Sequence, residues 1–295
     1  MKKYAYYPGC SLESLAKNYA LSALAVTKEF GLELNEIKDW NCCGSTAYFP
    51  VDELLAYTLV SRNLALAEKM GATDFVAPCS ACYKNAYFTN TYLQSDQDLA
   101  DHINYALEED QLQVKGSLKV RHLIELFVED VELAEVEKKA THPLTGLRVA
   151  PYYGCQMVRP RKVKEDVENP RYFENLLSAI GAEPIEFANK TRCCGGSLII
   201  TNRKAALDMV RILLQDAVEH GADVIATTCP MCDVNLEVYQ EQVNREFGTH
   251  FSIPVMYFTQ LMGLALGIKP AQLGVGKNEI ASLQAKAAAQ PAQTT

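Results

Sequence analysis

The sequence of 295 residues lacks both a secretory leader and an apolar stretch long enough to cross a bilayer. Its N-terminus, MKKYAYYPGC, reaches a proline and a glycine before any hydrophobic region of the kind a signal peptide needs. The longest apolar stretch, Ile253 to Ile268, contains Pro254 and Thr259 and is shorter than the roughly 20 residues of a membrane-spanning helix. We therefore expect a cytoplasmic protein in which this stretch forms a core strand and a buried helix.

Positive charge is also scarce, with 28 lysines and arginines against 36 aspartates and glutamates and a net charge of -8. This balance argues against a nucleic-acid-binding surface, which needs clustered cations, and favours small molecules or proteins as partners. No G-x-G-x-x-G pattern follows either of the early predicted strands, so the sequence shows no dinucleotide or flavin motif of its own. Electrons for a redox reaction would have to come from partner proteins.

Cysteine is too sparse for a fold held together by disulfides. Ten cysteines in 295 residues lie well below the roughly 8–10% of a disulfide scaffold. In a reducing compartment cysteines stay as thiols, and a supply of this size there indicates metal binding or redox chemistry. The ten cysteines are therefore candidates for a chemical role.

The cysteines fall into two sets with similar spacing. In the first half 31 residues separate the first cysteine from an adjacent pair and 35 more separate the pair from C-x-x-C, whereas in the second half the gaps are 37 and 34. The flanking segments agree: YAYYPGC matches VAPYYGC, NCCGS matches RCCGG, and GATDFVAPCSAC matches GADVIATTCPMC. Such a repeat indicates a duplicated domain. The two sets are Cys10, Cys42, Cys43, Cys79 and Cys82, and Cys155, Cys193, Cys194, Cys229 and Cys232.

The register of the repeat predicts the domain organisation. The first domain spans residues 1–128 and the second spans residues 146–270, with an acidic, lysine-containing linker at 129–145 between them. Residues 271–295 form a C-terminal tail. Its low-complexity end, from Lys277 on, is expected to be disordered or to contact a partner.

Each half alternates β-rich segments with helical ones, and glycines follow the helical segments as C-terminal caps. This alternation predicts an α/β fold of two pseudo-symmetric Rossmann-like halves, each a small parallel sheet flanked by helices. Because the loops after parallel strands emerge at one edge, the cysteines of each half should lie at the carboxyl ends of its strands. The predicted segments are 4–7, 12–30, 34–37, 52–70 and 74–77, and then 148–153, 171–180, 184–187, 203–220 and 223–227.

Four kinds of chemistry compete for these thiols. Structural disulfides are disfavoured because adjacent cysteines rarely bond each other and the expected compartment is reducing. A thioredoxin-like dithiol needs only C-x-x-C and leaves the adjacent pair unexplained. Zinc takes four thiolates and would leave the fifth of a set unused. Zinc could occupy both halves of a zinc-bearing scaffold, or one half while an iron–sulfur cluster occupies the other. Iron–sulfur chemistry suits more than four soft thiolates, although the compact C-x2-C-x2-C spacing of a standard cubane is absent.

The arrangement resembles the CCG domain family, and specifically the catalytic B subunit of heterodisulfide reductase. The resemblance covers residues 1–270: a cysteine, a CC pair followed by glycine, and C-x-x-C occur twice, and YYGC is followed by QMVRP. It implies that each set binds one noncubane [4Fe-4S] cluster and that a small disulfide is cleaved, or formed, between the clusters by paired one-electron steps. It also implies an oxidoreductase acting on sulfur groups, with a ferredoxin-like iron–sulfur C subunit and a flavin-containing A subunit as partners.

A second function stays open, because the same family architecture also serves as a membrane-attaching subunit of some succinate dehydrogenases and occurs in glycolate and lactate oxidising complexes. There the subunit would pass electrons to or from quinone, and only in that case is membrane association expected. The glycolate and lactate type often carries a ferredoxin-like segment first, whereas no ferredoxin spacing precedes Cys10.

Four basic residues close to the second cysteine set are weaker candidates. Arg159, Arg161 and Lys162 follow the first cysteine of that set, and Arg192 precedes its CC pair. Together they would form a cationic rim that holds an acidic substrate tail. The alternative is an ordinary solvated surface.

Two further candidates occupy aligned positions in the repeat. His122 and Tyr257 end the fourth strand of each half, where they could supply protons or line the cleft between the clusters. The alternative is a packing role in the core. The single tryptophan, Trp40, stands two residues before the first CC pair and is expected in the core or as a cover for the cluster.

Overall fold

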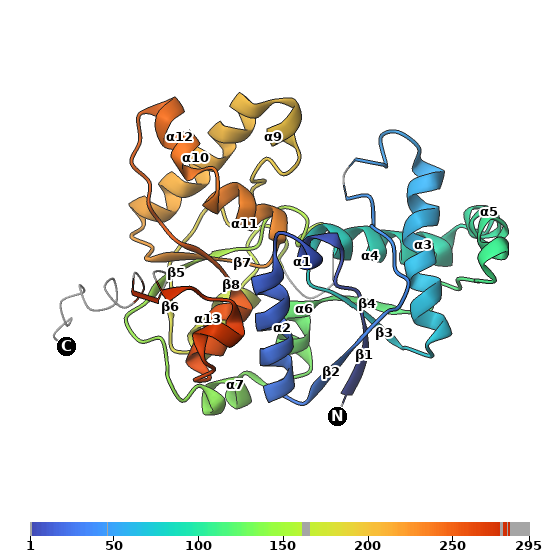
Figure 1. The fold of residues 1–295 in the computed structure, drawn as a ribbon, viewed down its shortest axis with the longest axis horizontal. Coiled ribbons are helices and arrows are strands. Elements are labelled where there is room, and N and C mark those ends of the chain that lie inside the picture. Colours follow the sequence, from blue (N-terminus) through green and yellow to red (C-terminus); the bar gives the residue numbers. More distant parts are fainter. Residues whose placement is uncertain (1, 46, 161–165, 278–279, 282, 284–295) are drawn as a thin grey trace.

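The computed structural model describes residues 2–45, 47–160, 166–277, 280–281 and 283, and shows two halves of the same topology (Figure 1). In the first half, four parallel strands form a sheet in the order β2-β1-β3-β4. The second half repeats this order as β6-β5-β7-β8, again all parallel. The predicted fold class is therefore confirmed. The strands are β1 (Lys2–Tyr6), β2 (Leu32–Glu36), β3 (Asp74–Ala77), β4 (Lys119–His122), β5 (Arg148–Tyr152), β6 (Glu183–Pro184), β7 (Val224–Thr227) and β8 (Val255–Tyr257).

The helices of the first half follow its strands. A single helix was predicted over 12–30, but the chain leaves the helix at Ser14. There Ser14 has φ −122° and ψ −90°, outside the helical region, and its hydroxyl donates to the Cys10 carbonyl (2.8 Å). The helices are α1 (Cys10–Glu13), α2 (Lys17–Glu29), α3 (Glu53–Lys69), α4 (Ser80–Ser95), α5 (Gln97–Leu107), the short 3-10 helix η1 (Glu108–Asp110) and α6 (Leu123–Glu129).

The second half repeats several of these helices with the same capping. Asp52 accepts the Leu55 N–H before α3 (2.9 Å), and Asn202 accepts the Ala205 N–H before α10 (3.3 Å). These residues are favoured N-caps because their side-chain oxygens satisfy an unpaired backbone donor. The helices are α7 (Leu133–Lys139), α8 (Tyr172–Ala179), α9 (Leu198–Thr201), α10 (Arg203–Glu219), α11 (Pro230–Glu237), α12 (Gln240–Phe247), α13 (Phe258–Ala265) and the 3-10 helix η2 (Pro270–Leu273).

The two halves pack on each other through α2 and α13, which lie side by side between the sheets (Figure 1). The rings of Tyr19 and Tyr257 stack with centroids 4.1 Å apart. Next to them, the hydroxyl oxygens of Ser22 and Thr259 lie 2.7 Å apart, fully buried. One hydrophobic cluster runs through both halves. The predicted buried helix within 253–268 is α13, and it forms this interface.

The predicted linker and the start of the predicted tail pack against the body of the molecule. Within 129–145 lies α7, whose Val136 is fully buried, and the His142 N–H donates to the Ala265 carbonyl (2.8 Å). Beyond residue 270, Leu273 of η2 is fully buried and η2 packs against α2. The division of the chain into two domains, a linker and a tail stays a prediction. The end of the linker contacts the second half, and the start of the tail contacts the first half.

Candidate metal centre

The first cysteine set gathers at the carboxyl ends of β1, β2 and β3. Cys10 opens α1 directly after β1, the CC pair lies in the loop after β2, and Cys79 is the N-cap of α4 after β3. The sulfurs of Cys10 and Cys42 are 3.7 Å apart, and those of Cys43 and Cys82 are 3.3 Å apart. The topology thus brings together thiols that are up to 72 positions apart in the sequence (82 − 10).

The second set repeats this arrangement after β5, β6 and β7. Cys155 follows β5, Cys229 is the N-cap of α11, and the sulfurs of Cys194 and Cys232 are 3.5 Å apart. The Gln156 amide lies 3.6 Å from the Cys155 sulfur. All ten cysteines lie in the described part of the chain, and all are free thiols.

The two sets meet where the halves join. Cys79 and Cys229, the first cysteines of the two C-x-x-C motifs, are buried and share a hydrogen bond between their thiols. The neighbouring hydroxyls of Ser80 and Thr228 are 3.3 Å apart. The duplication therefore places two equivalent sulfur-rich sites next to each other.

Both sets lower the pKa of the first cysteine of the CC pair, and in the second set bonds with Cys232 and Cys79 lower the pKa of Cys229 as well. Hydrogen bonds, first with Cys10, lower the pKa of Cys42 to about 2, and the bond between them raises the pKa of Cys10. In the second set, the bond with Cys155 is the largest effect that lowers the pKa of Cys193 to about 6, while the pKa of Cys155 is raised. Thiolates are the form that binds metals. In both sets the thiolate is thus favoured at the first cysteine of the CC pair.

A glycine stands close to a sulfur in each set. Gly9 and Gly154 precede the first cysteine of each set and have φ angles of 73° and 69°. A Cβ at Gly9 would lie 3.1 Å from the Cys82 sulfur, and one at Gly154 would lie 3.2 Å from the Cys232 sulfur. In the described residues no three histidine, cysteine or acidic side chains converge as ligands of a single metal ion. Five sulfur donors per half fit an iron–sulfur group.

The sequence alone did not identify Asn85 and Asn235 as polar residues of the two sulfur-rich sites. Each is buried and stands three positions after the last cysteine of its set. The side-chain amide of Asn85 donates to the carbonyls of Cys43 (3.2 Å) and Ser45 (2.7 Å). The repeated pattern C-x-x-C-x-x-N is the signal that would have identified them.

Two cations approach the sulfurs from opposite halves. Lys84, on α4, is half-buried, and Arg159, on the loop after β5, is exposed. Burial and then the charge of Arg159 lower the pKa of Lys84, while Cys43 and Cys155 act in the opposite direction. A cavity of about 460 Å³ beside Cys155 is lined by Arg159, with the other lining residues being Phe88, Val158, Val167, Glu168 and Thr191.

The remaining basic candidates differ in position. The backbone carbonyl of Arg192 accepts the Tyr152 hydroxyl (2.7 Å), and its exposed side chain lies 3.5 Å from Asn189. Arg161 and Lys162 lie outside the described residues. Substrate binding by these three residues stays a prediction.

The two aligned candidates at the strand ends are fully buried. His122 accepts the Ile124 N–H at the start of α6 (3.2 Å) and packs its ring edge against Tyr83. Tyr257 stacks on Tyr19, and its backbone N–H donates to Gln260 (3.0 Å). Burial and then the charge of Asp233 raise the pKa of Tyr257. Both residues thus begin the helix that follows their strand. Trp40 is half-buried with its ring edge against Tyr7.

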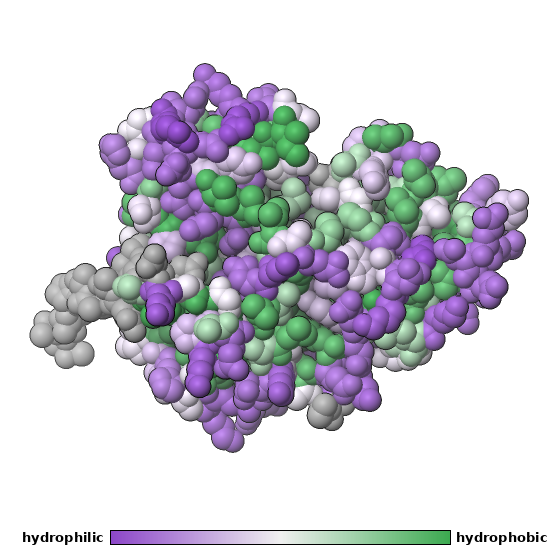
Figure 2. All heavy atoms as spheres, viewed as in Figure 1, coloured by the Kyte–Doolittle hydropathy of each residue, from purple (hydrophilic) through white to green (hydrophobic). Residues whose placement is uncertain are grey.

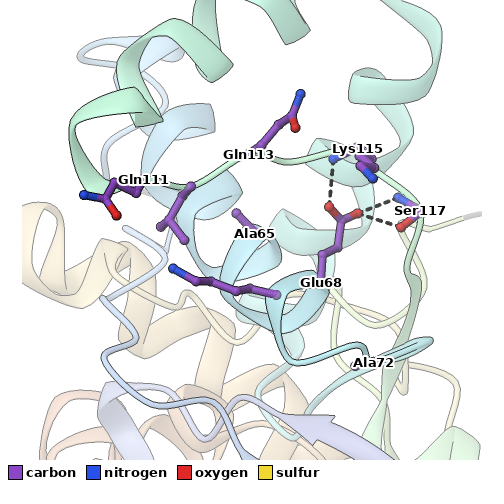
Figure 3. Close-up of a pocket in the computed structure, with 9 residues that line it drawn as sticks. Ala65, Glu68, Ala72, Gln111, Gln113, Lys115 and Ser117 are labelled. Carbon is purple, nitrogen blue, oxygen red and sulfur yellow. Dashed lines mark hydrogen bonds between the residues drawn. The ribbon is translucent and has the colours of Figure 1, made fainter.

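A separate cavity of about 340 Å³ lies at the opposite edge of the first sheet, near the amino ends of β3 and β4 (Figure 3). Glu68 of α3 accepts the N–H groups of Lys115 and Ser117 and the Ser117 hydroxyl, each at 2.8 Å. These bonds fasten the loop that leads into β4. This cavity is therefore away from the sulfurs.

The surface is notched between the lobe that carries α9 and the lobe that carries α3 (Figures 1 and 2). Figure 2 shows apolar residues on both sides of the notch, at α9 and at the loop before α3. Ile200 of α9 and Val51 of that loop are strongly exposed. Among the described residues, no helix has the length and apolar character to cross a membrane.

Comparison with known proteins supports the duplication. The family described as CCG, cysteine-rich domain, matches residues 4–85 and 149–237. The 8-methylmenaquinol:fumarate reductase membrane anchor subunit of Wolinella succinogenes is 33% identical over 281 residues, covering 95% of this chain and 97% of that protein. The B subunit of the ferredoxin/F(420)H(2)-dependent CoB-CoM heterodisulfide reductase of Methanosarcina acetivorans is 30% identical over 289 residues, 96% of each chain.

A solved structure supports the fold. The crystal structure of a hypothetical protein from Helicobacter pylori superimposes with a TM-score of 0.73 at 15% sequence identity, over 92% of this chain. This chain spans about half of that protein, 51% of its length.

Proposed function

Because this chain belongs to the CCG cysteine-rich domain family and carries the domain twice, we propose that it is an iron–sulfur redox subunit of the heterodisulfide reductase B type. Each five-cysteine set would hold one cluster. Noncubane [4Fe-4S] clusters bound there would supply one-electron transfers, two of which together meet the demand of a disulfide. Reductive cleavage of a disulfide consumes two electrons and two protons and releases two thiols. Oxidation of two thiols is the reverse.

The meeting of two equivalent five-thiol sets across the halves is the observation that carries this proposal. A single redox site would not require a duplicated domain. The cysteines differ in exposure. Cys79 and Cys229 are buried, so they keep water away from the junction between the two sets. Cys10 and Cys42 are exposed, so the first set is accessible to a substrate.

The charges beside the sulfurs favour an acidic substrate. Lys84 and Arg159 place positive charge near Cys43 and Cys155, one sulfur from each half. A carboxylate, phosphate or sulfonate on a small disulfide or thiol would offset the repulsion between these cations. Arg192, Arg161 and Lys162 are proposed as further members of this cationic rim.

Relatives that are subunits of larger reductases support partner proteins for this chain. We assign these roles to a ferredoxin-like iron–sulfur C subunit and a flavin-containing A subunit, since the sequence has no dinucleotide motif of its own. The exposed apolar residues beside the notch, such as Ile200 and Val51, suit a protein contact.

Electron transfer to or from quinone is the second candidate. The specific observation in its favour is the Wolinella succinogenes relative, whose name is that of a membrane anchor subunit of a quinol:fumarate reductase. In that case the same clusters would pass electrons between a partner dehydrogenase and a quinone at the membrane surface.

Anaerobic purification followed by iron, zinc and acid-labile sulfide analysis tests the cofactor. Two clusters predict about eight irons and about eight sulfides per chain. Zinc without sulfide would instead establish the zinc-bearing scaffold. The reduced protein is then mixed with a small acidic disulfide or with a menaquinone analogue. Rapid reoxidation by the disulfide supports the first function, and reoxidation by the quinone alone supports the second.

A further inference from the structure

The turn that follows each CC pair has an unusual backbone. Gly44 and Ser45 have φ angles of 71° and 49°, and Gly195 and Gly196 have φ angles of 89° and 41°. Successive N–H groups of a turn can form a concave site for an anion. Ser45 adopts this conformation although a side chain disfavours it. Something in the structure must therefore hold these turns.

The N–H groups of the turns point at cysteine sulfurs. The Gly195 N–H donates to the Cys193 sulfur (3.3 Å), and the equivalent Gly44 N–H bonds Cys42. In the first half the Ser45 N–H also donates to the Cys43 sulfur (3.4 Å). The turns therefore deliver hydrogen bonds to the sulfurs that the sequence predicts as ligands.

A buried asparagine lies on the other side of each turn. Asn235 donates to the carbonyls of Cys194 (3.0 Å) and Gly196 (3.2 Å), in the same way as Asn85 does to Cys43 and Ser45. These partners are carbonyl oxygens, so the side-chain nitrogen is the donor. The amide nitrogen of Asn235 also lies 3.7 Å from the Cys194 sulfur. Asn85 is 1% exposed and Asn235 is 3% exposed, so water does not compete for these bonds.

One peptide plane connects the two observations. The carbonyl of Cys194 and the N–H of Gly195 belong to the same trans peptide and point in opposite directions. The bond from Asn235 to that carbonyl consequently directs the Gly195 N–H toward the Cys193 sulfur. Asn85 does the same through the peptide between Cys43 and Gly44.

We infer that Asn85 and Asn235 are positioning residues, one per half, which hold the CC turn so that its N–H groups bond a ligand sulfur and thereby set the reduction potential of the bound cluster. Hydrogen bonds to sulfur withdraw negative charge, favour the reduced state and raise the potential. This inference rests on the proposed iron–sulfur function and adds to it a residue in each half that touches no metal.

The test compares Asn85→Asp and Asn235→Asp, which keep the size of the side chain and remove the amide donor. Each variant is expected to retain iron and sulfide while the midpoint potential of one centre becomes more negative, in a potentiometric titration followed by electron paramagnetic resonance. The two variants should shift different centres. Selective loss of about half of the iron, with the other centre unchanged, would also support the inference, since the turn then fails to hold its cluster.

Asn90→Asp is the matched control. Asn90 lies on α4 like Asn85 and is also buried, but its amide donates to the Leu118 carbonyl (2.9 Å), away from the CC turn. This variant should lower the unfolding temperature without moving either potential. Asn85→Ser and Asn235→Ser, which leave space for water, carry the same expected shift and are used if an aspartate variant does not fold.

The outcomes separate this inference from the proposed function. Wild-type protein without iron and sulfide contradicts the proposed function. Wild-type protein with both centres, and asparagine variants whose potentials match the wild type or change only as Asn90→Asp does, contradict the positioning role alone.

Discussion

Lys84 shows how a single side chain gains a role from its surroundings. It stands two positions after Cys82, and its ammonium group lies 5.4 Å from the ring centroid of Phe49 and 5.9 Å from that of Phe88. These rings hold the half-buried side chain in place through cation–π contacts. Arg159 of the other half adds a second positive charge nearby. An anion at this point would interact with both halves.

Removal of one of these charges should weaken the binding of an acidic substrate. We expect Lys84→Met and Arg159→Met each to raise the Kd of a small thiol that carries a carboxylate or sulfonate about tenfold, which corresponds to about 1.4 kcal/mol. Isothermal titration calorimetry at two salt concentrations measures this effect, which should shrink as salt rises. Lys69→Met, at the far edge of the first sheet, is the control and should bind as the wild type does. Equal affinities in all four proteins would refute the anion site.

The contact between α2 and α13 joins the halves at the scale of helices. These elements come from equivalent halves but are not equivalent to each other, since α2 follows the first strand of its half and α13 follows the fourth. Their contact combines stacked rings with one buried hydroxyl pair, Ser22 and Thr259. The Ser22 hydroxyl also donates to the Tyr19 carbonyl (3.1 Å), so Thr259 is the residue that needs this pair. A polar pair inside an apolar contact favours one register of the two helices, because another register would leave the Thr259 hydroxyl without Ser22.

A double-mutant cycle measures this pair. Ser22→Ala should lower the free energy of unfolding by about 1–3 kcal/mol, because it leaves the buried Thr259 hydroxyl without Ser22. Thr259→Val should cost less, because Ser22 keeps its bond to the Tyr19 carbonyl. The double variant should cost less than the sum of the two by about 0.5–3 kcal/mol. Chemical denaturation followed by circular dichroism provides the numbers. Strictly additive losses would mean that the two hydroxyls are not coupled.

At the scale of the whole molecule, one hydrophobic cluster spans both halves, and a second cluster lies within the second half. The hydrophobic cluster that contains Tyr19 of the first half also contains Phe173 and Phe258 of the second, and Leu273 of η2. The chain after the second domain therefore returns to cover α2. A molecule packed in this way should not unfold half by half.

Leu273→Ala tests this cooperativity. Loss of a buried leucine costs about 2–5 kcal/mol, and the loss should be felt in both halves. Trp40, the only tryptophan, reports on the first half by fluorescence, while circular dichroism reports on the whole chain. Both midpoints of thermal unfolding should fall by the same amount. A lower midpoint by circular dichroism with an unchanged Trp40 signal would show that the halves unfold independently.

The repeat, the ten cysteines and the parallel α/β order of each half are determined by the sequence itself. They follow from local patterns: cysteine spacing, glycines after helices, and short apolar segments before the first cysteine and the C-x-x-C of each half. The break of the first helix at Ser14 was missed because no glycine or proline marks it in the sequence. Likewise, β6 is limited to Glu183–Pro184 in the structure, where a longer strand was expected.

Only the tertiary structure decided how the two halves meet. The contact of Cys79 with Cys229, the stacking of Tyr19 on Tyr257 and the return of Leu273 to α2 join residues that no local pattern relates. The same holds for Asn85 and Asn235, which reach a turn about 40 positions earlier in the chain. The repeat determines which strands, helices and cysteines each half contains, because these follow from short patterns within that half. The relative placement of the halves is determined by the burial of shared apolar surface, which depends on both at once.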